Sequence, residues 1–226
     1  MVLLGGGELR NFTTLKVDAF AVGLIEKEEG ERVQALFFPT AAHDSKPYFN
    51  SFRKTYTSRL GAKVDVALLT TGEMDPEHIR EKVEKADLIY LGGGDTAYLL
   101  EVFSRTGADK LLIEAYEKGK VIVGLSAGAI CWFEYAHSDY EKMREGESAE
   151  YAIIKGMGII KGICVPHYDE ESRRESAAKL TGYSAVTAIE SDCGIYYENE
   201  EPVCAVGDGN AYVDGKELLK RHAPGE

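Results

Sequence analysis

The sequence predicts an α/β fold built on a doubly wound, mostly parallel β-sheet, with a small antiparallel extension at its C-terminal end. Short apolar runs alternate with helical patterns between residues 2 and 189, which is typical of a parallel sheet with helices on both faces. The apolar runs lack polar alternation, as is usual for strands buried on both faces. From Gly194 onward, strand-like runs are separated only by turn residues, which indicates an antiparallel meander.

Each element has its own signal along the chain. The expected strands are the apolar runs rich in Val, Ile, Leu or Phe, at residues 2–4, 33–38, 64–69, 88–91, 121–125, 159–165 and 185–189. The expected helices lie between them, at residues 15–27, 48–60, 76–85, 96–103, 109–118 and 171–180. One helix start is well marked, because Asp75 is a capping residue and Pro76 suits the first helical position. Residues 138–150 are polar and without period, which predicts an exposed loop, and no linker composition divides residues 1–226 into several domains.

Composition excludes several classes of protein. The chain has 226 residues, of which 44% are apolar and 6 are proline, so it is neither disordered nor collagen-like. Its 26 Lys and Arg against 38 Asp and Glu give a net charge of −12, which disfavours nucleic acid or an anionic membrane as a partner. The apolar runs are shorter than the ~18 residues of a membrane span and the N-terminus lacks a basic signal region, so we expect a cytoplasmic location. Four widely spaced cysteines are expected to be reduced core thiols: Cys131, Cys164, Cys193 and Cys204.

Three glycine-rich turns follow expected strands, at residues 5–7, 92–94 and 124–128. In an open α/β sheet, ligands bind at the carboxyl ends of the strands, where such turns lie. The third turn reads Gly-Leu-Ser-Ala-Gly between a strand and a helix-capable run, which is the sequence form of a nucleophile elbow. The flanking glycines would let the backbone turn sharply and expose the Ser126 hydroxyl. The alternative is a small-residue turn that only packs a helix against a strand.

A serine nucleophile needs a general base, and histidine is the side chain that titrates nearest to neutral pH. His167 follows the apolar run 159–165 through Pro166, so it stands at the carboxyl end of a strand, on the same rim as Ser126. The alternative is a capping or solvated histidine.

Acyl transfer also needs hydrogen-bond donors for the oxyanion, usually backbone N–H groups. One candidate is the N–H of Ala127, and a second would come from the turn 92–94, where the backbone can approach closely because side chains are absent. This turn could instead be a tight turn capped by Asp95, or an anion site at a helix N-terminus. It lacks the sequence patterns of nucleotide-binding loops.

The acid that would orient the imidazole is the least defined member of the site. Glu190 and Asp192 follow the last buried run, and either could reach the second nitrogen of His167. Asp169, two residues beyond His167, is an alternative. Carboxylates on such a rim are otherwise simply solvated.

Four blocks of the chain resemble peptidase E and its relatives, serine peptidases that include aspartyl dipeptidase and, more distantly, cyanophycinase. The blocks are Leu91-Gly-Gly-Gly-Asp-Thr, Gly124-Leu-Ser-Ala-Gly-Ala-Ile-Cys-Trp-Phe, His137-Ser-Asp139 and Pro166-His167-Tyr-Asp. The spacing of 32 residues between Gly94 and Ser126 is also similar to the family's. The resemblance covers most of the chain, from Gly5 to the C-terminal meander.

The resemblance implies a flavodoxin-like fold akin to that of class I glutamine amidotransferases, with Ser126 in place of their cysteine. It implies Ser126 as nucleophile, His167 as general base, and the N–H groups of Gly94 and Ala127 as the oxyanion hole. It also points to Asp139 as a functional carboxylate, one that could hold the free α-amino group of a substrate.

Two positions depart from the family pattern. Where peptidase E has its triad glutamate, this chain has Ser191, flanked by Glu190 and Asp192. Arg173 or Arg174 matches only loosely the family's arginine for an acidic substrate side chain.

These observations together predict a serine exopeptidase that hydrolyses dipeptides or short peptides through an acyl-enzyme on Ser126, with N-terminal aspartate as a candidate preference. No metal or organic cofactor is required, and we expect a monomer or a homodimer. Two alternatives stay open: a cyanophycinase-like or other amide or isopeptide hydrolase on the same scaffold, and a non-catalytic binding module in which the elbow is a structural relic.

Overall fold

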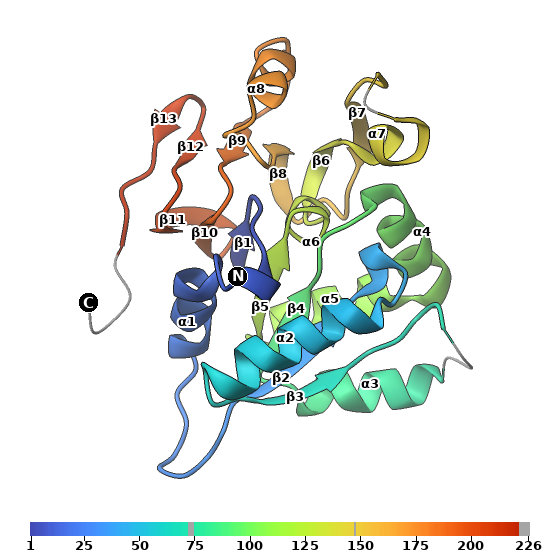
Figure 1. Ribbon diagram of the computed structural model, residues 1–226, viewed down its shortest axis with the longest axis vertical. Helices are drawn as coiled ribbons and strands as arrows, with labels where there is room; N and C mark the ends of the chain where they lie inside the picture. Colours follow the sequence, from blue (N-terminus) through green and yellow to red (C-terminus); the bar gives the residue numbers. More distant parts are fainter. Residues whose placement is uncertain (72–74, 147, 222–226) are drawn as a thin grey trace.

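The computed structural model describes residues 1–71, 75–146 and 148–221, and within them the chain forms two β-sheets (Figure 1). The larger sheet has the strand order β11-β10-β1-β5-β4-β2-β3. Its strands are β1 (Val2–Leu4), β2 (Gln34–Phe38), β3 (Lys63–Val66), β4 (Leu88–Leu91), β5 (Val121–Leu125), β10 (Cys193–Glu198) and β11 (Glu201–Gly207). The first five pair in parallel, whereas β10 and β11 continue the sheet antiparallel beyond β1. The predicted fold class, including the antiparallel C-terminal strands, is confirmed.

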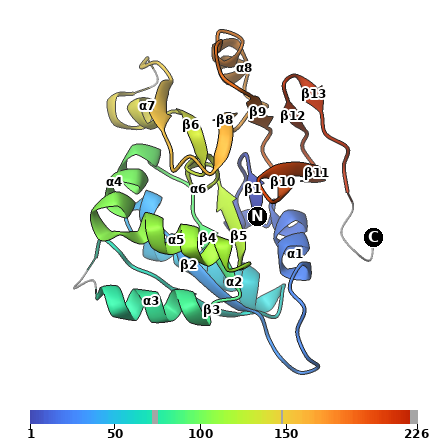
Figure 2. The same cartoon turned by 180° about the vertical axis from the view of Figure 1, so that it is seen from behind.

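Helices cover both faces of this sheet (Figures 1 and 2). On one face, α1 (Leu15–Gly23) and α2 (Lys46–Ser58) share an apolar cluster with Leu4 of β1. On the other face, α3 (Pro76–Lys85), α4 (Thr96–Thr106) and α5 (Ala108–Glu117) share a second cluster with Leu3. Neighbouring side chains of a strand point to opposite faces, so β1 contributes to both clusters. This double burial explains why the strands read as unbroken apolar runs.

Local capping sets the helix starts. The Asp75 side chain accepts a hydrogen bond from the Glu77 N–H at 3.0 Å, and Pro76 occupies the first turn of α3, as the sequence predicted. Helix α4 begins in the same way, with the Asp95 side chain accepting from the Tyr98 N–H at 2.9 Å. Helix α4 therefore starts directly after the turn 92–94.

One carboxylate lies inside the core between helices α1 and α2. Asp18 is fully buried, and it accepts hydrogen bonds from the Thr14 hydroxyl at 2.7 Å and the Tyr56 hydroxyl at 3.0 Å. Burial raises the pKa of Asp18 to about 7, although these two hydrogen bonds lower it.

The smaller sheet was not predicted as a separate sheet. Its strand order is β13-β12-β9-β8-β6-β7, and it forms the upper part of the molecule in Figure 1. Its strands are β6 (Phe133–Ser138), β7 (Ala152–Lys155), β8 (Ile160–Val165), β9 (Val186–Ile189), β12 (Ala211–Val213) and β13 (Lys216–Glu217). The predicted strands 159–165 and 185–189 are therefore present, as β8 and β9, but they belong to this sheet: β8 pairs with β6 and β9, and β9 also pairs with β12. The short helix α6 (Ala127–Ile130) leads the chain from β5 into this second sheet.

The segment 138–150, predicted to be a loop, contains the helix α7 (Tyr140–Glu145). None of the residues of α7 is buried, so the segment has no apolar period that could have indicated a helix. A further helix, α8 (Glu171–Ala177), follows β8.

All four cysteines are buried with free thiols, as expected. Burial raises the pKa of the Cys164 thiol, which disfavours its reactive thiolate form. None of the helices described for residues 1–71, 75–146 and 148–221 combines the length and apolar character that crossing a membrane requires.

Candidate active site

The turn between β5 and α6 holds Ser126 in a strained conformation. Ser126 has φ 49° and ψ −111°, outside the regions that residues with a side chain normally occupy. A Cβ atom on Gly124 would lie 2.2 Å from the carbonyl oxygen of Gly128, and one on Gly128 would lie 2.2 Å from the carbonyl oxygen of Leu91. Both flanking positions therefore need glycine, because α6 packs directly against β5 and β4. The turn has the form of a nucleophile elbow.

The structure brings Ser126 and His167 together. The Ser126 Oγ lies 3.0 Å from the Nε2 atom of His167, within hydrogen-bond distance. His167 follows β8 in the smaller sheet, and its backbone N–H donates to the carbonyl oxygen of Gly5 at 3.1 Å. Gly6 lies against the imidazole, since a Cβ atom there would be 2.4 Å from Nδ1. The serine thus comes from one sheet and the histidine from the other, and the turn after β1 contacts the histidine.

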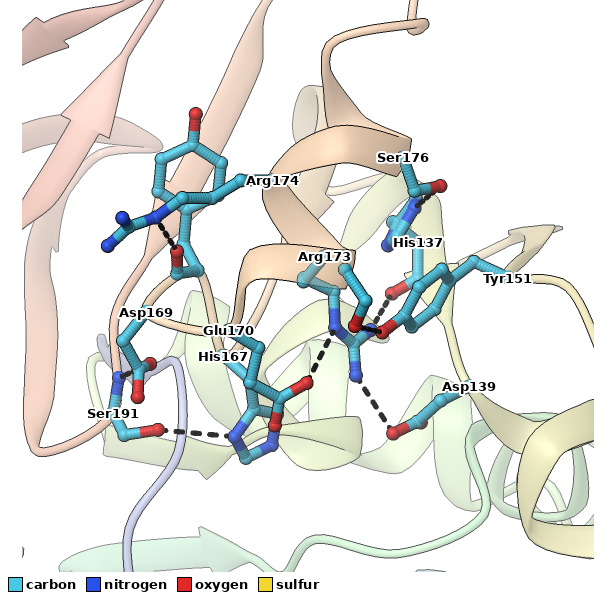
Figure 3. A network of polar contacts seen from close by, with 12 residues as sticks. His137, Asp139, Tyr151, His167, Asp169, Glu170, Arg173, Arg174, Ser176 and Ser191 are labelled. Atoms are coloured by element: carbon cyan, nitrogen blue, oxygen red, sulfur yellow. Dashed lines mark hydrogen bonds and ion pairs between the residues drawn. The ribbon is translucent and has the colours of Figure 1, made fainter. Parts of the chain in front are cut away.

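A third side chain contacts the other imidazole nitrogen. The Nδ1 atom of His167 lies 3.3 Å from the Oγ of Ser191 (Figure 3). Ser191 lies between β9 and β10, and its backbone N–H donates to the Asp169 carboxylate at 2.7 Å. Sequence reasoning listed Ser191 only as a departure from the family pattern. The register of the family motif was the signal that could have identified it.

The carboxylates of Glu190 and Asp192 do not occupy this position, which corrects the sequence prediction. Glu190 accepts from the backbone N–H of Asn210 at 2.8 Å and pairs with Arg174 at 3.3 Å. Asp192 has φ 58°, and its Oδ1 atom is buried without a hydrogen-bond partner among the described residues. Neither carboxylate is hydrogen-bonded to the imidazole of His167, whose Nδ1 atom contacts Ser191 instead.

The surroundings of His167 favour its neutral form. Burial lowers the pKa of His167, and the positive charge of Arg173 lowers it further. The carboxylates of Glu170, Asp139 and Asp169 raise it, but the net direction is downward. A neutral imidazole with a free Nε2 lone pair is what a general base for Ser126 requires.

The turn 92–94 approaches the serine as a bare backbone. The Gly93 N–H is used, because it donates to the Tyr48 hydroxyl at 3.0 Å. Gly94 has φ 140°, and a Cβ atom there would lie 2.2 Å from the carbonyl oxygen of Ala41. Gly94 lines the same pocket as Ser126, and Ala127 is the first residue of α6. The N–H groups of Gly94 and Ala127 are therefore the candidate oxyanion donors.

The pocket above the serine has a volume of about 440 Å³. Ser126 and His167 line it from one side, and Asp139, at the start of α7, lines it from another. Sequence reasoning did not identify two further lining residues, Arg10 and Tyr48. Neither belongs to a motif, and both come from the N-terminal part of the chain, far from Ser126 in sequence.

Arg173 does not face the pocket as a free cation, contrary to its predicted role in substrate binding. Its side chain is only 1% exposed, and it donates to the Asp139 carboxylate at 2.8 Å and to the His137 carbonyl oxygen at 3.1 Å (Figure 3). Its guanidinium also lies over the Tyr151 ring, 4.5 Å from the centroid. Arg173 therefore holds Asp139 in place, and Arg174 is paired with Glu190.

A serine and a histidine in hydrogen-bond contact, on an elbow at the carboxyl ends of α/β strands, define a serine hydrolase. Comparison with known proteins narrows the class: the model of peptidase family S51 matches residues 1–204, so the chain belongs to this family. It is a serine peptidase, and the non-catalytic module considered from the sequence is set aside.

Individual relatives agree with this assignment. The chain is 31% identical over 173 residues to the uncharacterized peptidase YgaJ of Bacillus subtilis, covering 76% of this chain and 70% of that protein. It is 32% identical over 123 residues to peptidase E of Streptomyces coelicolor, covering 54% and 49% of the two chains. The crystal structure of a peptidase from an acI-B1 actinobacterium has the same fold, with a TM-score of 0.67 at 22% identity over 100% of this chain and 94% of that one.

Proposed function

We propose that the protein is an exopeptidase that hydrolyses dipeptides or short peptides through an acyl-enzyme on Ser126. The observation that carries this proposal is the 3.0 Å contact between the Ser126 hydroxyl and the Nε2 atom of His167 inside the pocket. This distance supports proton transfer from the Ser126 hydroxyl to His167, and the lowered pKa of His167 favours the neutral imidazole that a general base needs.

The reaction would proceed in two halves. The Ser126 Oγ attacks the scissile carbonyl carbon while its proton passes to Nε2 of His167. The N–H groups of Gly94 and Ala127 hold the oxyanion, and the imidazolium then protonates the leaving amine. Water next attacks the ester with His167 again accepting the proton, which releases the acyl product and restores Ser126.

The shape and charge of the pocket support a small substrate. Its volume of about 440 Å³ matches the size of a small ligand such as a dipeptide. The Asp139 carboxylate, oriented by Arg173, would pair with the free α-amino group of the substrate. A preference for N-terminal aspartate is also proposed, and its cation would be Arg10, because Arg173 is already paired.

A panel of dipeptides tests the proposal. Amine release would be measured for Asp-X, Glu-X, Leu-X and β-Asp-X dipeptides and their N-acetyl forms, with wild type, Ser126→Ala and the surface control Ser104→Ala. We expect Ser126→Ala to lose ~10³-fold or more of the activity, Ser104→Ala to match wild type, and N-acetylation to block cleavage.

Two results of this panel would contradict the proposal in different ways. Cleavage restricted to β-Asp-X would assign an isopeptide hydrolase. Full activity in Ser126→Ala would exclude Ser126 as the nucleophile.

A further inference from the structure

The side of His167 that faces away from Ser126 is held by two loops tied together. One loop runs from His167 to Glu170, and the other is the turn around Ser191 between β9 and β10. The Tyr168 N–H donates to the Ile189 carbonyl oxygen at 3.0 Å, and the Ser191 N–H donates to the Asp169 carboxylate at 2.7 Å. These cross-links fix Ser191 and Asp169 relative to the imidazole.

The polar atoms in this corner match in donor and acceptor character. If Nε2 of His167 is to accept the Ser126 proton, Nδ1 must carry the hydrogen and donate it. The Ser191 hydroxyl, 3.3 Å from Nδ1, can accept this bond and still donate its own hydrogen. Asp169 is the candidate receiver, because its carboxylate lies beside Ser191 and accepts the Ser191 backbone N–H at 2.7 Å. The Ser191 side chain also contributes to lowering the pKa of Asp169.

We propose that Ser191 and Asp169 together do the work of the missing triad acid: Ser191 orients the imidazole, and Asp169 stabilises its charged form through the Ser191 hydroxyl. This inference rests on the proposed function. Both are positioning residues, since neither touches the pocket's reacting atoms. During attack the Ser126 proton moves to Nε2, the Nδ1 hydrogen stays on the imidazole, and Asp169 remains ionised. Positive charge therefore develops on the imidazole, beside Ser191 and Asp169, while the balancing negative charge develops on the substrate carbonyl oxygen.

Two other carboxylates near His167, those of Glu170 and Asp139, pair with Arg173. Glu170 lies 3.9 Å from the Nε atom of Arg173, and Asp139 pairs with the same guanidinium at 2.8 Å (Figure 3). Burial alone would raise the pKa of Asp169, but hydrogen bonds from the Ser191 backbone and side chain and the charge of His167 hold it below its ordinary value. Asp169 is therefore anionic at neutral pH, as the relay requires.

The test compares Ser191→Ala, Asp169→Asn and the double variant with Glu171→Gln, which removes an exposed charge nearby without a bond to Ser191. Losing one hydrogen bond to a charged group corresponds to a fall in kcat on the order of 10- to 100-fold for Ser191→Ala. We expect Asp169→Asn to reduce kcat in the same direction, and the double variant to be no worse than Ser191→Ala. The acid limb of the kcat/KM profile should move to lower pH in these variants, because the imidazolium loses stabilisation. Glu171→Gln should behave as wild type.

A readout independent of activity is the imidazole nitrogen spectrum. In ¹⁵N-histidine-labelled protein, with the signal assigned by its loss in His167→Gln, wild-type His167 should show the neutral tautomer protonated on Nδ1. Ser191→Ala should show a mixture of tautomers and a lower imidazolium pKa.

Unchanged kcat, pH profile and tautomer in both single variants would overturn the relay, whereas the proposed function would stand as long as Ser126→Ala is inactive. If Ser126→Ala retains activity, the proposed function fails, and the nitrogen spectrum still decides whether Ser191 orients His167.

Discussion

Replacing the buried Asp18 by asparagine should make the protein more resistant to unfolding at alkaline pH. The Asp18 carboxyl has a pKa of about 7 in the folded protein against 3.8 for an ordinary aspartate, because burial disfavours its charged form. An asparagine in the same place is neutral at every pH. It can keep a hydrogen bond from the Tyr56 hydroxyl through its amide oxygen.

The size of the effect follows from proton linkage. Below pH 3.8 the carboxyl is protonated in both the folded and the unfolded chain, so its full contribution to stability is present. As pH rises, the unfolded chain loses its proton first, and the folded state loses about 1.4 kcal/mol per pH unit until pH passes 7. The total reaches about 4 kcal/mol, and more than half of it falls between pH 5 and 8.

Urea unfolding followed by the fluorescence of the buried Trp132, at pH 5, 6, 7 and 8, would measure this. Other titrating groups cancel in the difference between Asp18→Asn and wild type, so that difference in the free energy of unfolding should grow by roughly 2 to 3 kcal/mol in favour of the variant over this range. Asp65→Asn, with a 57% exposed side chain, serves as the control and should show a difference within ~1 kcal/mol. A difference between Asp18→Asn and wild type that stays constant with pH would refute the reasoning.

Three further predictions concern the site. Gly94→Ala should lower kcat at least ~100-fold, because the new Cβ atom would lie 2.2 Å from the Ala41 carbonyl oxygen and would displace an oxyanion donor. Steady-state kinetics would measure the loss, and a circular dichroism spectrum would show whether the variant is still folded. Arg173→Met should raise KM for dipeptides about tenfold more than it lowers kcat, because the Asp139 carboxylate loses the guanidinium that lies 2.8 Å away and orients it. A KM equal to that of the wild type would contradict the role of Arg173 in orienting Asp139. Activity should have its acid midpoint below pH 6.5, because burial and Arg173 lower the pKa of His167 and keep the base neutral; a midpoint above this value would count against His167 as the base.

The sequence predicted the larger sheet well because its central parallel strands are buried on both faces and read as apolar runs, although the edge strand β3 buries no residue. It did not reveal that β8 and β9 belong to a second sheet. A buried parallel strand has the same sequence pattern whichever sheet it joins. The polar helix α7 was not predicted for a related reason: it buries no residue, so its sequence has no helical hydrophobic periodicity.

The residues of the site likewise differ in how far the sequence could identify them. Ser126 lies in a motif that requires glycines on both sides, and His167 stands at the carboxyl end of a strand, so both could be selected from local sequence. Ser191 reaches His167 across 24 residues with a hydroxyl group, which no composition or spacing rule distinguishes from a surface serine. Glu190 and Asp192 were both predicted for their charge, but the direction of each side chain depends on backbone geometry that the sequence does not display.

The serine and the histidine of this site follow strands of different sheets: Ser126 comes directly after β5, and His167 comes shortly after β8. Their 3.0 Å contact exists only while the two sheets keep their relative position. Catalytic activity therefore depends on the packing between the two sheets. Proteins open in parts before they unfold as a whole. Heating or dilute denaturant that unfolds the smaller sheet would therefore separate His167 from Ser126. Activity would then be lost while the larger sheet is still folded.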